Sequence, residues 1–253
     1  MNKTMNNTKP LLLITGVTSG VGLSLINHYA GKYHILALSS NEKKLKELFA
    51  GKEDVTTFQV DLSDPEACDA AFRTLSEKYG YIPYLINNAG VNQKVELNDI
   101  TYEQILEFLH VNAIAPMITM QRLLPLMKEH NFGRIINITS GAPLNCFPGF
   151  ALYSASKGAL NAITVTAAKE FADYNIKINL MSPGPVKSNM APIAPMEPSV
   201  CHPTVEHLLT LDENGPTGKF YWLGYEIPIF PDLEGIEWLQ GKADSTKYTK
   251  VVK

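Results

Sequence analysis

Short apolar segments alternate with longer amphipathic ones along most of the chain. The short segments are apolar at most positions, which is typical of parallel strands buried on both faces of a sheet. They lie at residues 10–15, 33–39, 55–61, 84–89, 133–139 and 176–182. Apolar residues at helical spacing predict helices near residues 22–30, 41–50, 64–79, 101–128 and 152–174. The alternation predicts an α/β fold, a doubly wound parallel sheet with helices on both faces.

The last part of the chain has a weaker pattern. Residues 184–203 are rich in proline and lack a period, which predicts a long loop of the kind that covers a binding site as a lid. Residues 203–211 have the pattern of a short helix. Residues 218–230 alternate like a strand, with a turn at Gly224.

The two ends of the sequence differ from the rest in being polar. We expect residues 1–9 to be flexible, and residues 240–253 to form a polar, solvated tail. No linker or repeat divides the chain, so we expect a single domain over residues 1–253.

Composition narrows the classes of function. The formal net charge of -3 gives no electrostatic basis for binding nucleic acid. The cysteines, Cys68, Cys146 and Cys201, are scattered without the spacing of metal ligands, so we expect free thiols and no metal site. We find no segment that predicts a signal peptide or a membrane span. These features favour a cytoplasmic protein with a small-molecule substrate.

A glycine-rich loop follows the first predicted strand. Gly16, Gly20 and Gly22 would allow a tight turn and a close backbone approach, and the next helix would offer free N–H groups to a pyrophosphate. An ordinary turn between a strand and a helix is the alternative, because a glycine pattern alone is weak evidence.

Five motifs in order resemble the short-chain dehydrogenases/reductases. They are T-G-x-x-x-G-x-G from residue 15, NNAG at 87–90, Asn112, Ser140 and YSASK at 153–157. The chain is similar to the short, single-domain branch from about Leu11 to Ser188. The resemblance implies a Rossmann-like sheet of about seven strands, a nicotinamide cofactor and a homo-oligomer, either a dimer or a tetramer.

The candidate catalytic residues are Asn112, Ser140, Tyr153 and Lys157. Tyr153 and Lys157 are four residues apart on one predicted helix, and a nearby cation lowers the pKa of a phenol, so Tyr153 would exchange a proton with the substrate oxygen. Ser140 follows a strand, where its hydroxyl would hold the substrate carbonyl. A tyrosine–lysine pair by itself more often lies on a helix surface. The resemblance implies that the Asn112 backbone holds a water of the proton relay.

Pro116 interrupts the helix predicted over residues 101–128. In an α-helix the N–H of residue 116 would bond the carbonyl of Asn112, and proline lacks this N–H. We interpret Pro116 as leaving that carbonyl free for the water of the relay. The alternative, which does not exclude the first, is that Pro116 starts a second helix after a bend.

The resemblance, together with the end of the second strand, gives the candidate cofactor residues. They are Gly16, Thr18, Ser19, Gly20, Val21, Gly22, Ser39, Ser40, Asn41, Lys43, Asp61, Leu62, Asn88, Ala89, Gly90, Tyr153, Lys157, Pro183, Gly184, Val186 and Ser188.

The end of the second strand bears on the choice between NADP(H) and NAD(H). An acidic residue there binds the ribose of NAD, but this chain has Ser39, which would not repel a 2′-phosphate. Ser40, Asn41 and Lys43 follow, although the basic residues common in NADP users are missing at Ser19 and Ser40. We expect NADP(H) to be preferred, with NAD(H) as the alternative, since the lysines also suit a solvated helix face.

The candidate substrate pocket is mostly apolar. Its residues are Ser140, Ala142, Cys146, Phe147, Phe150, Tyr153 and Met190. These segments contain no arginine to bind a carboxylate or phosphate, which predicts an uncharged, moderately hydrophobic carbonyl or alcohol. Core packing is the alternative role for any one of the apolar side chains.

The segment GPTGKF, at residues 215–220, resembles the ending of carbonyl reductases in the family. We therefore expect NADPH-dependent reduction of a ketone or aldehyde. An NAD-dependent alcohol dehydrogenase and a non-catalytic, cofactor-sensing protein are the alternatives. A sugar-nucleotide epimerase is disfavoured by the length and by the glycine spacing.

Overall fold

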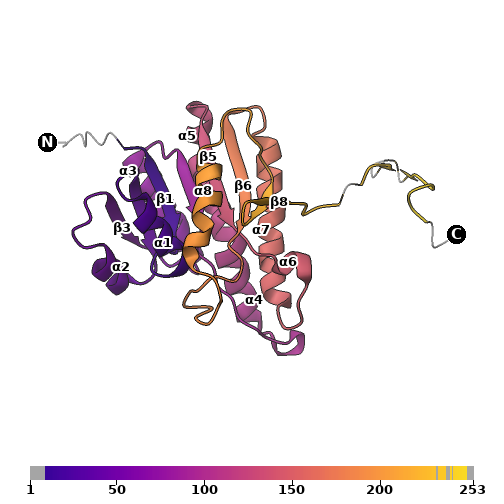
Figure 1. Cartoon of the computed structure of the whole chain (residues 1–253), viewed down its shortest axis with the longest axis horizontal. Coiled ribbons are helices and arrows are strands. Elements are labelled where there is room, and N and C mark those ends of the chain that lie inside the picture. Colours follow the sequence, from indigo (N-terminus) through magenta and orange to yellow (C-terminus); the bar gives the residue numbers. More distant parts are fainter. Residues whose placement is uncertain (1–8, 232, 238–239, 241, 250–253) are drawn as a thin grey trace.

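Eight strands form one sheet in the computed structural model, which describes all residues except 1–8, 232, 238–239, 241 and 250–253 (Figure 1). The strands are β1 (Leu11–Thr15), β2 (His34–Ser39), β3 (Val55–Gln59), β4 (Tyr84–Asn87), β5 (Gly133–Ile138), β6 (Ile176–Ser182), β7 (Phe220–Trp222) and β8 (Tyr225–Ile227). Their order is β3-β2-β1-β4-β5-β6-β7-β8, and all neighbours are parallel except β7 and β8. The six expected strands and the turn near Gly224 are confirmed, and the doubly wound order is that of a Rossmann-like fold.

Helices cover both faces of the sheet (Figure 1). They are α1 (Gly20–Tyr29), α2 (Glu42–Phe49), α3 (Pro65–Tyr79), α4 (Tyr102–Leu109), α5 (Ala115–Glu129), α6 (Ala142–Asn145), α7 (Ala151–Glu170) and α8 (His202–Leu209). The start of α3 shows how the sequence sets a boundary. The Asp64 side chain accepts hydrogen bonds from the N–H groups of Glu66 and Ala67, and Pro65 occupies the first turn.

The pleat of the strands divides the core into two layers. Leu12 of β1 packs in a cluster with residues of α1, α2 and α8, whereas Leu13 packs with residues of α3, α5 and α7. Both leucines are fully buried. Because alternate side chains of a strand point to opposite faces, a strand covered on both sides must be apolar at successive positions.

The prediction of one helix over residues 101–128 is wrong, because the segment is not a single α-helix. It divides into α4, a π-helical turn η2 (His110–Ile114) and α5. The N–H of Ala115 bonds the carbonyl of His110, five residues earlier, which marks the extra residue of a π turn. Pro116 lies in the first turn of α5, where a proline costs least.

The lid and the two ends also differ in part from expectation. The loop expected to reach residue 203 ends sooner, because a 3₁₀ turn η3 (Pro198–Cys201) leads into α8. Residues 1–8 of the expected flexible start lie outside the described residues. The expected polar tail, as far as it is described, contains β10 (Lys242–Ala243), which pairs with β9 (Ile236–Glu237).

Candidate active site

A cleft of about 1350 Å³ opens at the carboxyl ends of the parallel strands. It extends from the β1–α1 loop and the ends of β2 and β3 to the residues after β5 and β6. In an open α/β sheet, ligands bind at the point where the strand order reverses, which here lies between β1 and β4. The volume exceeds the usual range for a single small ligand, so the cleft has room for a dinucleotide and a substrate together.

The glycine loop has no space for side chains at two positions. A Cβ at residue 22 would lie 2.3 Å from the Gly16 carbonyl oxygen, and one at residue 16 would lie 2.7 Å from the Ala89 Cα. The Asn88 side chain donates to the carbonyl oxygens of Thr15 and Gly16, at 3.0 and 2.9 Å, which ties the loop to the end of β4. The loop therefore presents its backbone, with the amino end of α1, to the cleft, as a pyrophosphate requires.

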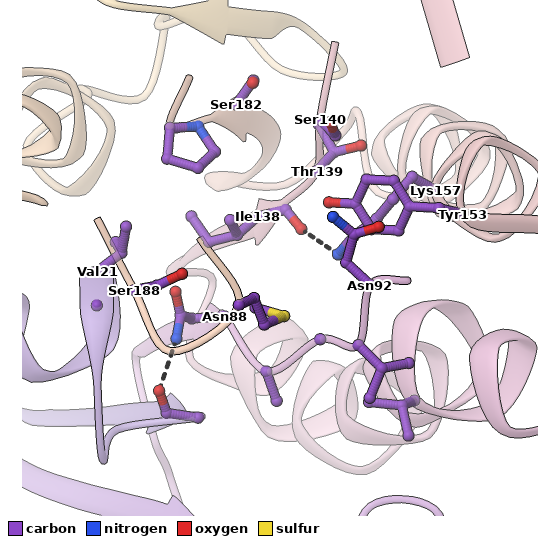
Figure 2. Close-up of a pocket in the computed structure, with 18 of the residues that line it drawn as sticks. Val21, Asn88, Asn92, Ile138, Thr139, Ser140, Tyr153, Lys157, Ser182 and Ser188 are labelled. Carbon is purple, nitrogen blue, oxygen red and sulfur yellow. Dashed lines mark hydrogen bonds between the residues drawn. The ribbon is translucent and has the colours of Figure 1, made fainter. Parts of the chain in front are cut away.

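Ser140, Tyr153 and Lys157 converge on one side of the cleft, across from Val21 and Ser188 (Figure 2). Ser140 follows β5, and the other two belong to α7. The Ser140 hydroxyl accepts a hydrogen bond from the Ala142 N–H at 3.1 Å. Because that bond uses a lone pair, the hydroxyl proton stays available to a substrate oxygen or to Tyr153.

The environment of Tyr153 acts on its pKa in two directions. Burial of the phenol raises the pKa, and the hydrogen bond with Ser140 acts against this by stabilising the phenolate. The balance is a raised pKa, opposite to the lowering expected from a neighbouring lysine cation. Desolvation is the larger effect here, and a sequence does not reveal how deeply a phenol lies in a pocket.

Lys157 is buried, and its Nζ donates to the Ile138 carbonyl oxygen at 2.8 Å, the bond drawn in Figure 2. Burial lowers the pKa of Lys157 to about 8, since an ammonium group loses its hydration. The Lys157 ammonium and the Asn112 side chain both border Gly90: a Cβ at residue 90 would be 3.4 Å from Lys157 Nζ and 3.0 Å from Asn112 Oδ1.

Asn112 is fully buried in η2 and does not line the cleft. Its Oδ1 accepts from the Val91 N–H at 2.9 Å, and its Nδ2 donates to the Val91 carbonyl at 2.9 Å and to Ser156 Oγ at 3.0 Å. The side chain is thus occupied in holding the segment after NNAG. Only the backbone of Asn112 is left for any part in proton transfer.

The π turn sharpens the role of Pro116. A residue 116 with an N–H would donate to the carbonyl of Val111 in π geometry, or to that of Asn112 in α geometry. Proline supplies neither bond, so residue 116 leaves both carbonyls without its N–H. The missing donor was predicted from the sequence, but the π turn, which places two acceptor carbonyls before Pro116, was not expected.

Most of the expected cofactor residues line this cleft together. They are Gly16, Thr18, Ser19, Gly20, Val21, Ser39, Ser40, Asp61, Leu62, Asn88, Ala89, Gly90, Tyr153, Lys157, Pro183, Gly184, Val186 and Ser188. Gly22 instead packs behind the loop.

Asn41 and Lys43 are not among the residues that line the cleft. The Asn41 side chain accepts from the Lys44 N–H at 2.9 Å and so caps α2. The Lys43 side chain is largely exposed, and its Nζ lies 3.9 Å from Glu47 Oε1 on the same helix. The pattern at the end of β2 therefore contributes serine hydroxyls to the cleft, and these two side chains serve the helix that follows.

The expected substrate residues other than Cys146 line the cleft, namely Ser140, Ala142, Phe147, Phe150, Tyr153 and Met190. Cys146 is exposed and ends α6 with a left-handed backbone, φ 50°, so it is not a wall of the pocket. Trp222 and Ile227 also line the cleft but were missed. The sequence predicts a strand for their segment. The place of β7 and β8 at the edge of the sheet, next to β6, follows only from the strand order.

Two further features of the described residues concern metals and membranes. No group of three or more histidine, cysteine, aspartate or glutamate side chains in the described part of the chain is arranged to hold a metal ion. None of the helices in that part has both the length and the apolar content that crossing a bilayer requires.

The fold and the cleft define a class of protein, a Rossmann-like oxidoreductase with a dinucleotide site beside a tyrosine–lysine pair. Residues 10–197 match the family model described as short chain dehydrogenase. The chain belongs to the short-chain dehydrogenase/reductase family and is an NAD(P)-dependent oxidoreductase of that family.

Two curated proteins illustrate the likeness in sequence. Dehydrogenase/reductase SDR family member 7B of Mus musculus is 32% identical over 191 residues, which cover 72% of this chain and 59% of that protein. The chain thus spans less than two thirds of the mouse protein's length. Carbonyl reductase family member 4 of Danio rerio is 31% identical over 183 residues, which cover 71% of this chain and 77% of that protein.

Two solved structures illustrate the likeness in fold. ElxO with NADP bound is 27% identical, with a TM-score of 0.76 over 85% of this chain and 97% of that one. 4-Hydroxyisoleucine dehydrogenase complexed with NADH is 26% identical, with a TM-score of 0.80 over 85% of this chain and 96% of that one. The two relatives hold different nicotinamide dinucleotides in the same fold.

Proposed function

We propose that this chain reduces the carbonyl group of an uncharged, moderately hydrophobic ketone or aldehyde, with NADP(H) as the preferred cofactor. The observation that carries the proposal is that Ser140, Tyr153 and the buried Lys157 line one cleft whose other walls are mostly apolar, with the Ser140 and Tyr153 hydroxyls hydrogen-bonded to each other. The glycine loop fits the cofactor, because its backbone is bare where a pyrophosphate must approach. The bound nicotinamide supplies hydride chemistry.

The chain's own residues handle the substrate oxygen and its proton. Ser140 donates a hydrogen bond to the carbonyl oxygen and orients it toward Tyr153. Tyr153 gives the oxygen its proton as negative charge develops there. Lys157 stabilises the phenolate that remains, and the Asn112 carbonyl, which receives no N–H from Pro116, holds the water that restores the proton.

The serine hydroxyls at the end of β2 support a preference for NADP(H). Ser39 Oγ lies 3.2 Å from Thr18 Oγ1, so two hydroxyls meet where the 2′-substituent of the adenosine ribose would lie, and Ser40, which follows Ser39 in the chain, also lines the cleft. No carboxylate is present at Ser39 to repel a phosphate. Two observations favour NAD(H) instead: Lys43 Nζ lies 3.9 Å from Glu47 Oε1 and does not line the cleft, and one solved relative holds NADH.

Substitution of Ser39 tests the cofactor preference. For the wild type, we expect a lower Kd for NADPH than for NADH. Ser39→Asp should raise the Kd for NADPH at least tenfold, because a carboxylate would face the 2′-phosphate, and should lower the Kd for NADH. Ser245→Asp, at an exposed position that does not line the cleft, is the charge control and should change neither Kd. A wild type that binds NADH more tightly would overturn the preference.

A panel of substrates tests the reaction. Wild-type protein with NADPH should reduce uncharged aryl and alkyl ketones faster than 2-oxo acids of similar size, because the described pocket residues offer no arginine for a carboxylate. Loss of the reduced nicotinamide absorbance measures both rates. Turnover only in the direction of alcohol oxidation with NAD would favour the alcohol dehydrogenase.

The assembly and the location of the protein are further parts of the proposal. A homo-oligomer, dimer or tetramer, is supported by an exposed apolar stripe on α4, η2 and α5, formed by Tyr102, Leu106, Ile114 and Met117. A cytoplasmic location is supported by three cysteines that are all free.

A further inference from the structure

His110 joins two walls of the cleft without lining it. It begins the π turn η2 and is 8% exposed, and its Nδ1 lies 2.7 Å from the carbonyl oxygen of Leu62. A carbonyl accepts and does not donate, so Nδ1 carries the hydrogen in this contact. The other ring nitrogen, Nε2, is buried and has no hydrogen-bond partner among the described residues. The ring thus makes one polar contact, and that contact is with Leu62.

Leu62 belongs to the short loop after β3 that borders the cleft. Asp61, Leu62 and Ser63 all line the cleft, and Asp61 Oδ1 accepts from the Ser63 N–H and hydroxyl at 2.9 and 2.7 Å. Those bonds shape the loop internally and hold the pKa of Asp61 below its usual value. The bond to His110 is different, because it fixes the loop to a helix.

This end of the cleft is where the adenine would lie. The pyrophosphate is placed at the glycine loop after β1 and the ribose at the end of β2. Since β3 is the next strand outward, the base falls beside the loop that follows β3. Val111, the neighbour of His110, also lines the cleft.

We propose that His110 is a positioning residue that sets the distance between the Leu62 loop and the Val111 wall, and so tunes affinity for the adenine end of the cofactor. The inference rests on the proposed placement of the adenosine in this cleft. The same π turn, η2, also contains Asn112, so one short segment supports both the adenine site and the candidate proton relay.

The test measures the Kd of adenosine 2′,5′-bisphosphate and of AMP by calorimetry, because both contain the adenine end and neither contains nicotinamide. His110→Leu should raise the Kd of each nucleotide about 3- to 10-fold, the usual effect of one lost hydrogen bond. His110→Asn, whose amide can donate from nearly the place of Nδ1, should stay within about twofold of the wild type. When NADPH is varied at saturating ketone, kcat should change less than the KM for NADPH.

His34→Leu is the matched control. His34 is also buried and also makes one side-chain hydrogen bond, from Nε2 to Thr56 Oγ1 at 2.9 Å, but it lies at the start of β2, away from the cleft. The His34→Leu variant should lower the melting temperature without changing the Kd of either nucleotide. If His110→Leu does not fold, His110→Gln replaces it, because the longer glutamine side chain carries its amide past the place of Nδ1. A nucleotide Kd for His110→Gln equal to that of His110→Asn would then overturn the proposal.

The outcomes separate this inference from the proposed function. A wild type that binds a nucleotide, with unchanged Kd in His110→Leu, overturns the role of His110 alone. A wild type that binds neither nucleotide overturns both the adenosine site and the inference.

Discussion

At the scale of single residues, the central feature is the buried ammonium group of Lys157, whose burial destabilises the folded protein. Lys157 donates a hydrogen bond to the Ile138 carbonyl, and burial lowers its pKa to about 8. A shift of this size corresponds to a cost on the order of 3 kcal/mol for keeping the charge in the folded protein. Such a cost persists at a site whose function requires the charge.

Replacing Lys157 by methionine should therefore stabilise the protein while removing activity. The expected gain at pH 7 is about 2 kcal/mol after the loss of the Ile138 bond, or roughly 5 °C in melting temperature. The folded pKa lies below the unfolded one, so the cost is full below pH 8 and falls as the pH rises toward the usual lysine pKa. Melting curves at pH 7 and pH 9.5 measure this; a variant less stable than wild type at pH 7 would contradict it.

The residues that sequence reasoning misplaced share a physical cause. Asn41 and Lys43 have the right chemistry for a phosphate, but a helix cap and a neighbouring carboxylate compete for them. Cys146 is directed outward by the left-handed end of α6. By contrast, a close backbone approach fixes the position of Gly16, and the end of a strand fixes that of Ser140, so local geometry alone brings both to the cleft.

At the scale of elements, the break between α4 and α5 is the main departure from the predicted helix. Periodicity predicted one helix because apolar spacing survives a single inserted residue, and it gave no sign of the π turn. The short α6 was missed for a similar reason: four residues are too few to show a period. Strand positions were predicted well because buried parallel strands are apolar at nearly every position.

Pro116→Ala tests whether the break serves catalysis. Alanine restores an N–H that can bond the carbonyl of Val111 or Asn112, so we expect kcat to fall several-fold with a changed pH–rate profile and little change in the Kd for NADPH. Pro125→Ala, a proline further along α5, is the matched control. Equal pH–rate profiles for Pro116→Ala and wild type would contradict the role.

At the scale of the whole molecule, an exposed apolar stripe crosses α4, η2 and α5. Tyr102, Leu106, Ile114 and Met117 are all exposed and follow helical spacing. Exposed apolar side chains that form a continuous patch commonly mark a protein interface. The sequence predicted an oligomer only by resemblance, because periodicity does not distinguish a face buried in the chain from one buried between chains.

Leu106→Glu should weaken the assembly. We expect wild-type protein to have at least twice the 27.9 kDa mass of one chain in light scattering. The variant should shift toward a single chain because a buried, unpaired carboxylate is costly. Ala70→Glu, on exposed α3, controls for added charge. A wild type of single-chain mass would contradict this use of the stripe.

The most direct test of the account is the rate of ketone reduction by Tyr153→Phe with NADPH. The phenylalanine keeps the ring and removes the one hydroxyl that is proposed to protonate the substrate. We expect kcat/KM to fall by about 10²- to 10⁴-fold, with the Kd for NADPH within about twofold of wild type. A variant that reduces the ketone at the wild-type rate would show that Tyr153 is not the acid, and the account of this cleft would be wrong.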